Sequence, residues 1–187
     1  MPPKVKITKM DIIETALELV RQSGEAAINA RSVASALGCS TQPVFSNFAT
    51  IEELKSAVLS AAYERYRGFL EREVASGKYP QYKAFGMAYV RFAKEERELF
   101  KLLFMCDRNG EELIPTTDFE ESVEIIMNSN GVSKEKAERM HFEVWVWVHG
   151  IATMLATSFL ELDYELISKM VTDVYMGIRA RHLSEEN

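Results

Sequence analysis

The chain has 187 residues, of which 47% are hydrophobic and 27% charged, and its formal net charge is −6 at pH 7. This composition is typical of a soluble globular protein. The length allows one large domain, or a small domain followed by a larger one. The sequence has neither an apolar run that could span a bilayer nor the apolar core of a secretion signal. We therefore expect a cytoplasmic protein with no membrane partner.

The negative charge is unevenly distributed. The first 50 residues contain five basic and four acidic residues, which gives +1, so the rest of the chain carries −7. Lys4, Lys6 and Lys9 fall within the first nine positions, with no acidic residue among them. Because phosphate binding needs local positive charge rather than a basic chain, these lysines favour a short phosphate-binding arm. A solvated tail is the alternative.

The first helix is predicted over residues 9–23. Thr8 followed by Asp11 three residues later is a typical helix start, and Gly24 marks the end. One face of this helix is apolar, with Ile12, Ile13, Ala16, Leu17 and Val20. We expect that face to pack across the two helices that follow and to complete a three-helix head.

Residues 30–54 predict two short helices joined by a tight turn, and then the start of a third helix. Gly38 stands where a helix commonly ends in a left-handed residue. Ser40 is expected to cap the second helix, whose first turn tolerates Pro43 because its missing N–H would have no partner there. A helix, a glycine-containing turn and a second helix form the arrangement of a DNA-reading helix-turn-helix.

The second helix of this motif has distinct faces. Val44 and Phe48 form an apolar stripe that we expect to hold the helix onto the head. The outward positions are Thr41, Gln42, Phe45, Ser46 and Asn47. Thr50 and Glu53 form a capping box, so a long helix should begin there and run to about Val74, before Gly77 and Pro80 break it.

Residues 31–54 resemble the DNA-binding signature of TetR-type transcriptional regulators. The matching framework is Ala34, Gly38, Ser40, Phe45, Phe48, Glu53 and Leu54. Three residues depart from it: Pro43 replaces a Thr-like residue, Phe45 the commoner Tyr, and Ile51 a Lys that typically touches a phosphate. The resemblance implies that helix 40–47 enters the major groove of a palindromic operator. The expected DNA contacts are Lys6, Arg31, Ser40, Thr41, Gln42, Phe45, Ser46 and Asn47.

From Tyr82 onward the apolar residues keep helical spacing and predict helices over residues 82–104, 119–128, 134–160 and 164–182. The Asn130-Gly131 turn closes the second of these, and Ser133 should cap the third. No strand-like alternation is present, so the expected fold class is all-α. We expect a helix-turn-helix head over residues 1–50 and a helical effector-binding and dimerisation domain over residues 51–187, with 51–77 as the linking helix.

The last two predicted helices have broad apolar faces, which a symmetric four-helix dimer interface requires. The residues assigned to a homodimer interface are Met154, Ser158, Ile167, Val171, Val174 and Ile178. The strings Trp147-Val148-His149-Gly150 and Glu98-Leu99-Phe100 are similar to the ligand-binding half of one TetR-type subgroup.

The C-terminal half carries more aromatic and Met side chains than a single layer between helices needs, which favours an enclosed apolar pocket. The assigned lining residues are Phe85, Tyr89, Phe92, Phe104, Met105, Met127, Phe142, Trp145 and His149. Tyr89 or His149 should orient a neutral or cationic hydrophobic effector. An ordinary core is the alternative for any one of these residues.

The sequence has no motif whose residues and spacing indicate a catalytic site. His141-Phe142-Glu143 lacks the Pro-Cys-x-x-Cys partner of a zinc deaminase, and Cys39 and Cys106 have no metal-like spacing, so we expect reduced thiols, no metal and no cofactor. The expected function is a homodimeric DNA-binding repressor released by a small hydrophobic effector, and not an enzyme. The alternative is a helical dimer that binds a hydrophobic ligand or a protein partner and has little DNA affinity.

Overall fold

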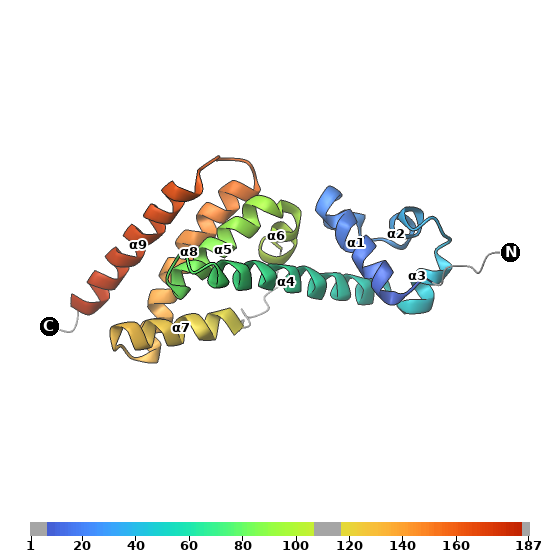
Figure 1. Ribbon diagram of the computed structural model, residues 1–187. Helices are drawn as coiled ribbons and strands as arrows, with labels where there is room; N and C mark the ends of the chain where they lie inside the picture. Colours follow the sequence, from blue (N-terminus) through green and yellow to red (C-terminus); the bar gives the residue numbers. More distant parts are fainter. Residues whose placement is uncertain (1–6, 107–116, 185–187) are drawn as a thin grey trace. The chain divides into compact units, whose positions relative to one another are not determined.

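The computed structural model describes residues 7–106 and 117–184 and is all-helical over these two ranges, which confirms the predicted fold class (Figure 1). The chain forms two compact units. Unit 1 comprises Met1–Arg67 and Glu96–Cys106, and unit 2 comprises Gly68–Glu95 and Asp107–Asn187. The functional division predicted at residue 50 stays a prediction. In the part of the chain that the structure describes, no helix is long and apolar enough to cross a membrane.

Unit 1 begins with α1 (Lys9–Ser23), whose start the sequence predicted correctly. The Thr8 hydroxyl accepts a hydrogen bond from the Asp11 N–H (3.1 Å), and the Asp11 carboxylate accepts one from the Thr8 N–H (2.7 Å). The backbone hydrogen bond from Thr8 lowers the pKa of Asp11. Of the predicted apolar face, Ile12, Ala16 and Val20 are fully buried.

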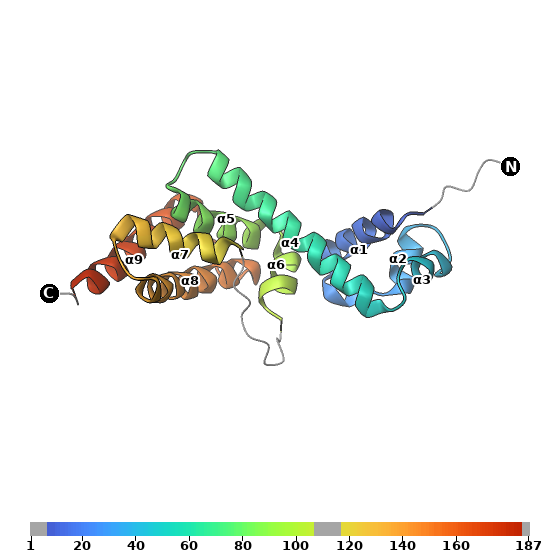
Figure 2. The same ribbon diagram turned by 90° about the horizontal axis from the view of Figure 1, so that it is seen from below.

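After a 3₁₀ turn (Glu25–Ala27), α2 (Ala30–Ala36) and α3 (Gln42–Asn47) form the helix-turn-helix. Asn29 caps α2 by accepting the Ser32 N–H (2.9 Å), and Gly38 has φ +64°, the left-handed conformation that the turn requires. The predicted Ser40 cap is wrong. Thr41 occupies the cap position without a side-chain hydrogen bond, and α3 begins one residue later. The helices α1, α2 and α3 contact one another, as predicted for a three-helix head (Figure 2).

The long helix α4 (Ile51–Ala75) starts and stops where the sequence predicted. The Thr50 hydroxyl accepts the Glu53 N–H (3.1 Å), while the Glu53 carboxylate accepts the Ala49 N–H (2.8 Å) rather than the Thr50 N–H of a standard capping box. The bond from Ala49 lowers the pKa of Glu53. Because the two units meet in sequence between Arg67 and Gly68, α4 belongs to both.

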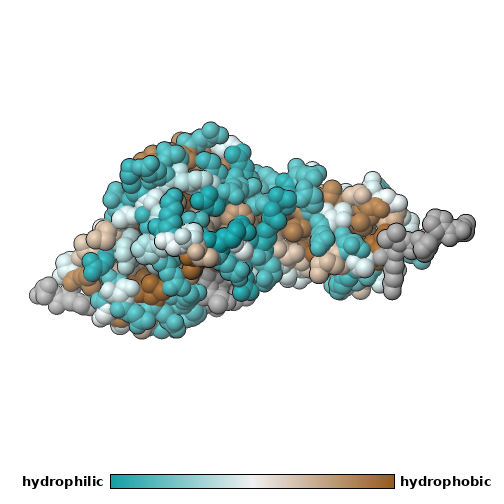
Figure 3. All heavy atoms as spheres, in the orientation of Figure 1, coloured by the Kyte–Doolittle hydropathy of each residue, from teal (hydrophilic) through white to brown (hydrophobic). Residues whose placement is uncertain are grey.

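Unit 2 is built around α8 (Lys134–Ala156), which contacts α5 (Gln81–Glu95), α7 (Thr117–Asn130) and α9 (Tyr164–Ser184) (Figures 1 and 2). Ser133 caps α8 as predicted, accepting the Lys136 N–H (3.3 Å). Figure 3 shows mostly hydrophilic residues on the visible face of unit 2, interrupted by hydrophobic patches.

The bounds of α7, α8 and α9 differ from the predicted ones, and for α9 the only difference is an end at Ser184 rather than at residue 182. The third predicted helix, α8, ends at Ala156 and not at Leu160, because Ser158 adopts φ +57° and the Phe159 N–H turns back to donate to the Met154 carbonyl (2.9 Å). The helix predicted over 119–128 extends over Thr117–Asn130, and Gly131 (φ +66°) ends it.

Candidate nucleic-acid interface

The helix α3, which was predicted to read DNA, is fixed to the head from one side. Val44 and Phe48 are each 1% exposed. The Lys9 ammonium lies 4.7 Å from the centre of the Phe48 ring and 3.4 Å from a Glu53 carboxylate oxygen. These contacts leave the opposite face of α3 open to solvent.

The exposed face of α3 carries Thr41, Gln42, Phe45 and Ser46, and Asn47 is half-buried at its edge. Two of these side chains bond to their own helix. The Ser46 hydroxyl donates to the Gln42 carbonyl (2.9 Å), and the Asn47 amide donates to the Pro43 carbonyl (2.8 Å). Within the described residues, no hydrogen bond engages the side chain of Thr41 or Gln42, and the Phe45 ring is 52% exposed.

The other predicted contact residues come from segments outside α3. Ser40 is exposed in the turn before α3, and Arg31 is exposed in the first turn of α2, with no ion pair to any residue that the structure describes. Lys6 lies outside the described residues. Lys55, near the start of α4, is paired with Glu25 at 3.6 Å.

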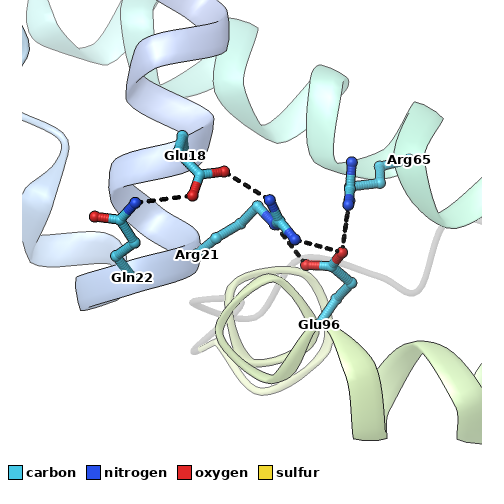
Figure 4. A network of polar contacts seen from close by, with 5 residues as sticks. All are labelled: Glu18, Arg21, Gln22, Arg65 and Glu96. Carbon is cyan, nitrogen blue, oxygen red and sulfur yellow. Dashed lines mark hydrogen bonds and ion pairs between the residues drawn. The ribbon is translucent and has the colours of Figure 1, made fainter.

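A buried carboxylate in unit 1 was not found by sequence reasoning. Glu96, 6% exposed, precedes α6 (Arg97–Phe104) and bonds to α1 and α4 (Figure 4). Arg21 donates to it through Nε (2.7 Å) and Nη2 (3.0 Å), and Arg65 donates through Nε (2.8 Å) and Nη2 (2.5 Å). The hydrogen bond to Glu96 raises the pKa of Arg21. The sequence did not indicate that Glu96 is buried, because it lies in a run of charged residues and such runs usually form a solvent-exposed face.

Aromatic contacts also join α6 to α4 within unit 1. The Phe104 ring packs against Tyr66 of α4 and Phe100, with ring centres 5.3 Å apart in both pairs. Phe104 and Met105 were both assigned to the effector pocket. The structure places them in unit 1, where Met105 is 40% exposed.

The other residues assigned to the pocket lie in unit 2, in different environments. The Tyr89 hydroxyl lies 2.8 Å from Nδ1 of His149, and the Trp145 ring stacks on His149 at 5.1 Å. Burial lowers the pKa of His149, which favours the neutral ring that can accept the Tyr89 O–H. Phe142 stacks on Trp145 but is 52% exposed.

Three further residues assigned to the pocket lie on α5 and α7. Phe92 is fully buried and meets Phe69 edge to face at 5.3 Å, Met127 packs on the buried cluster between α7 and α8, and Phe85 is half-buried on α5. An open hollow of about 370 Å³ lies elsewhere, in unit 1, lined by Glu14, Thr15, Glu18, Leu19, Gln22 and Ala36. The enclosed apolar pocket therefore stays a prediction.

Some of the residues assigned to a dimer interface are buried within unit 2, and others are exposed. Ile167 and Val171 face the interior of unit 2, at 0% and 4% exposure, whereas Met154 is 37% exposed. Ser158 is exposed, Val174 is half-buried, and Ile178 packs on the cluster between α7 and α8. Further large apolar side chains lie exposed on α8, on α9 and in the turn between them: Phe142, Val146, Phe159, Leu160, Leu166 and Met176.

No group of three or more potential metal ligands among His, Cys, Asp and Glu occurs in residues 7–106 and 117–184. Both cysteines, Cys39 and Cys106, are unpaired thiols.

Residues 82–174 match the family model described as the tetracycline repressor-like C-terminal domain. The chain belongs to the TetR family. This membership makes it a transcriptional regulator of a family that binds DNA and small molecules and generally dimerises.

A solved structure supports the fold of this TetR-family chain. It is described as a member of the TetR family from Streptomyces coelicolor A3 and matches with a TM-score of 0.60. The match covers 89% of this chain and 96% of that chain at 17% sequence identity, so the similarity is one of fold. No curated protein matches this TetR-family chain in sequence.

Proposed function

We propose that this TetR-family regulator is a homodimeric repressor that binds a palindromic operator and is released by a small hydrophobic effector. Residues 1–50 would read the DNA, and residues 51–187 would bind the effector and the second subunit, with residues 51–77 linking them. The observation that carries the proposal is the open face of α3, where Thr41, Gln42 and Phe45 stand exposed on a helix that Val44 and Phe48 anchor. We place its action in the cytoplasm.

The chemistry of this face supports the proposal that it binds DNA. The N-terminal residues of a recognition helix contact base edges in the major groove, and flanking polar and basic residues contact phosphates. Arg31 is exposed and has no ion pair to a described residue, so its guanidinium is available for a phosphate. The acidic remainder of the chain limits non-specific association.

A homodimer would cover the apolar surface of α8 and α9. Phe142, Val146 and Met154 lie one turn or two turns apart along α8 and are all exposed, and Leu166 and Met176 are exposed on α9. A two-fold axis would place these strips against their copies in a four-helix arrangement. Met154 and Ser158 keep the interface role that the sequence suggested. Ile167 and Val171 would support the interface from the interior of unit 2.

The effector would bind beside the pair formed by Tyr89 and His149 in unit 2. These two polar groups lie among aromatic neighbours, the pattern of a largely apolar site with few orienting contacts. A neutral His149 suits a neutral or cationic hydrophobic molecule better than an anion. Binding there would bias the positions of the heads through α4, which belongs to both units.

The proposal is tested by fluorescence anisotropy with labelled duplexes from the region upstream of the gene. We expect salt-dependent binding of one dimer per palindromic site, which a lipophilic effector from a compound panel reverses. Arg31→Ala should weaken binding to all sequences about equally and reduce the salt slope by about one. Glu124→Ala, an exposed change in unit 2, serves as the control. A dimer that binds lipophilic compounds but no duplex would instead support the alternative of a ligand- or partner-binding protein.

A further inference from the structure

The exposed face of α3 has few side chains left for reading bases. The Ser46 hydroxyl and the Asn47 amide are bonded to backbone carbonyls one turn earlier in the same helix. Gln42 and Phe45 lie three residues apart, on the same side of α3, and both are exposed. The pair therefore forms the centre of the surface that would meet the major groove.

The chemistry of Phe45 restricts what it can recognise. The phenyl ring has no hydrogen-bonding atom, yet 52% of the residue is exposed on an otherwise polar face. In the major groove the apolar group presented by a base pair is the C5 methyl of thymine. A ring placed against any other base edge would remove water from a polar group without replacing its hydrogen bond.

Gln42 complements this contact. It is the first residue of α3, and within the described residues its amide has no intramolecular hydrogen bond. A glutamine amide can bond simultaneously to N6 and N7 of adenine. Side chains at positions i and i+3 of a helix are about 5–6 Å apart. Because base pairs along the duplex are spaced by roughly 3.4 Å, such a pair can reach adjacent base pairs or pairs one step further apart.

We propose that Phe45 reads the methyl group of a thymine in each half-site and that Gln42 reads an adenine one or two base pairs away. The half-site then contains an A·T-rich step at the centre of the α3 footprint. This inference rests on the proposed function, because it assumes that α3 enters the major groove. It adds the base classes that are recognised and the residue responsible for each.

The test begins with the full-length protein and a pool of random duplexes, from which bound sequences are selected and aligned. Each thymine of the selected palindrome is then replaced, symmetrically in both half-sites, by deoxyuridine, which lacks only the C5 methyl. At one thymine per half-site the substitution should weaken binding roughly 15-fold in total, or about four-fold for each buried methyl. 5-Bromodeoxyuridine, whose bromine is similar in size to a methyl, should restore the affinity.

Protein variants assign the effect to its residue. Phe45→Ala should bind the thymine and deoxyuridine duplexes equally, and Phe45→Leu should keep part of the difference. Gln42→Ala should keep the full thymine effect and lose the preference at the adenine instead. Gln42 and Phe45 are both exposed side chains, so circular dichroism should show an unchanged fold for all three variants.

The outcomes separate this inference from the proposed function. If selected duplexes bind but no deoxyuridine substitution matters, or if Phe45→Ala keeps the thymine preference, the reading by Phe45 is wrong while DNA binding stands. If no duplex is selected and the exposed ring binds protein instead, both the proposed function and this inference are overturned.

Discussion

Glu96 and Arg21 form a bidentate ion pair in unit 1, in which the two carboxylate oxygens accept hydrogen bonds from the guanidinium at 2.7 and 3.0 Å. Arg65 donates to the same carboxylate from α4. A single side chain at the start of α6 thus fastens this helix to α1 and to the unit 1 portion of α4 (Figure 4). Removing its charge would leave Arg65 and Arg21 without this shared carboxylate, although Arg21 would keep its ion pair with Glu18 (2.6 Å).

We predict that Glu96→Gln lowers the free energy of unfolding of unit 1 by about 1–3 kcal/mol, the range for losing charged hydrogen bonds at a buried group. The partial exposure of both arginines, at 33% and 40%, keeps the effect below that of a fully buried pair. Denaturant unfolding followed by circular dichroism measures it. Glu95→Gln, the same change one residue earlier, should cost less than about 0.5 kcal/mol because Glu95 is 47% exposed. Equal effects of the two changes would contradict the structural role of Glu96.

Phe48→Ala should destabilise the head by about 3–5 kcal/mol, because it removes a ring that is 1% exposed and leaves a cavity beside α3. Phe45→Ala, three residues earlier, should change stability by less than about 0.5 kcal/mol because its ring already faces solvent. Thermal melting of both variants gives the comparison. If both variants melted with the wild type and only bound DNA more weakly, the assigned faces of α3 would be wrong.

Val146→Asp should convert the proposed dimer into a monomer that keeps its helical content. The residue is 49% exposed in the single chain, so a carboxylate there is hydrated in the monomer and becomes costly when a second copy covers it. Sedimentation velocity at micromolar concentration measures the state. Ser129→Asp, an exposed change on α7, should leave the dimer intact. A wild-type monomer would contradict the interface outright.

Ile51→Lys should strengthen operator binding and steepen its salt dependence by about one further released ion. Ile51 is the first residue of α4, at the position where the resemblance places a phosphate-contacting lysine. Anisotropy titrations between low and physiological salt measure the slope. Ile51→Met, which adds no charge, should leave that slope unchanged.

The stability of unit 2 should decrease as the pH falls below the ordinary His pKa of 6.5. Burial lowers the pKa of His149 in the folded protein, so the unfolded chain binds a proton there first. The contribution of the neutral His149 ring to the stability of unit 2 is complete above pH 6.5. It is lost as the pH falls toward the lowered pKa of His149 in the folded protein. Unfolding at pH 7.5 and 5.5 tests this prediction, and His149→Asn should flatten the profile while retaining an acceptor near the Tyr89 hydroxyl. A His149 ring that titrates above 6.5 in an NMR experiment would refute it.

Local rules explain most of what the sequence predicted correctly. Thr8, Gly38 and Ser133 act on residues within one turn, so their roles as caps and turn can be recognised from neighbouring letters. The same rules failed at Ser40, because Thr41 takes the cap position although both are suitable residues. They also failed at Ser158, whose left-handed conformation is rare outside glycine.

Long-range contacts explain what the sequence did not predict. Glu96 lies 75 residues from Arg21 and 31 from Arg65, and no local pattern connects these positions. Similarly, helical spacing groups Ile167 and Val171 with Val174 and Ile178 as an apolar face, but it does not say whether α8 or a second chain covers each residue. The pairing of Tyr89 with His149 requires the register between α5 and α8, which only packing sets.

The hydrogen bonds that Ser46 and Asn47 make within α3 have a consequence for how such a regulator could acquire new target genes. Neither side chain contributes to the core, and the two residues beside them, Gln42 and Phe45, are exposed. If Gln42 and Phe45 read the bases as proposed, substitutions at these two positions are enough to change the operator sequence that the head recognises, and they do not disturb the buried residues that keep the head folded. A duplicated copy could then diverge to a different operator in two substitutions, while the half proposed to bind the effector and the stability of the protein stay the same.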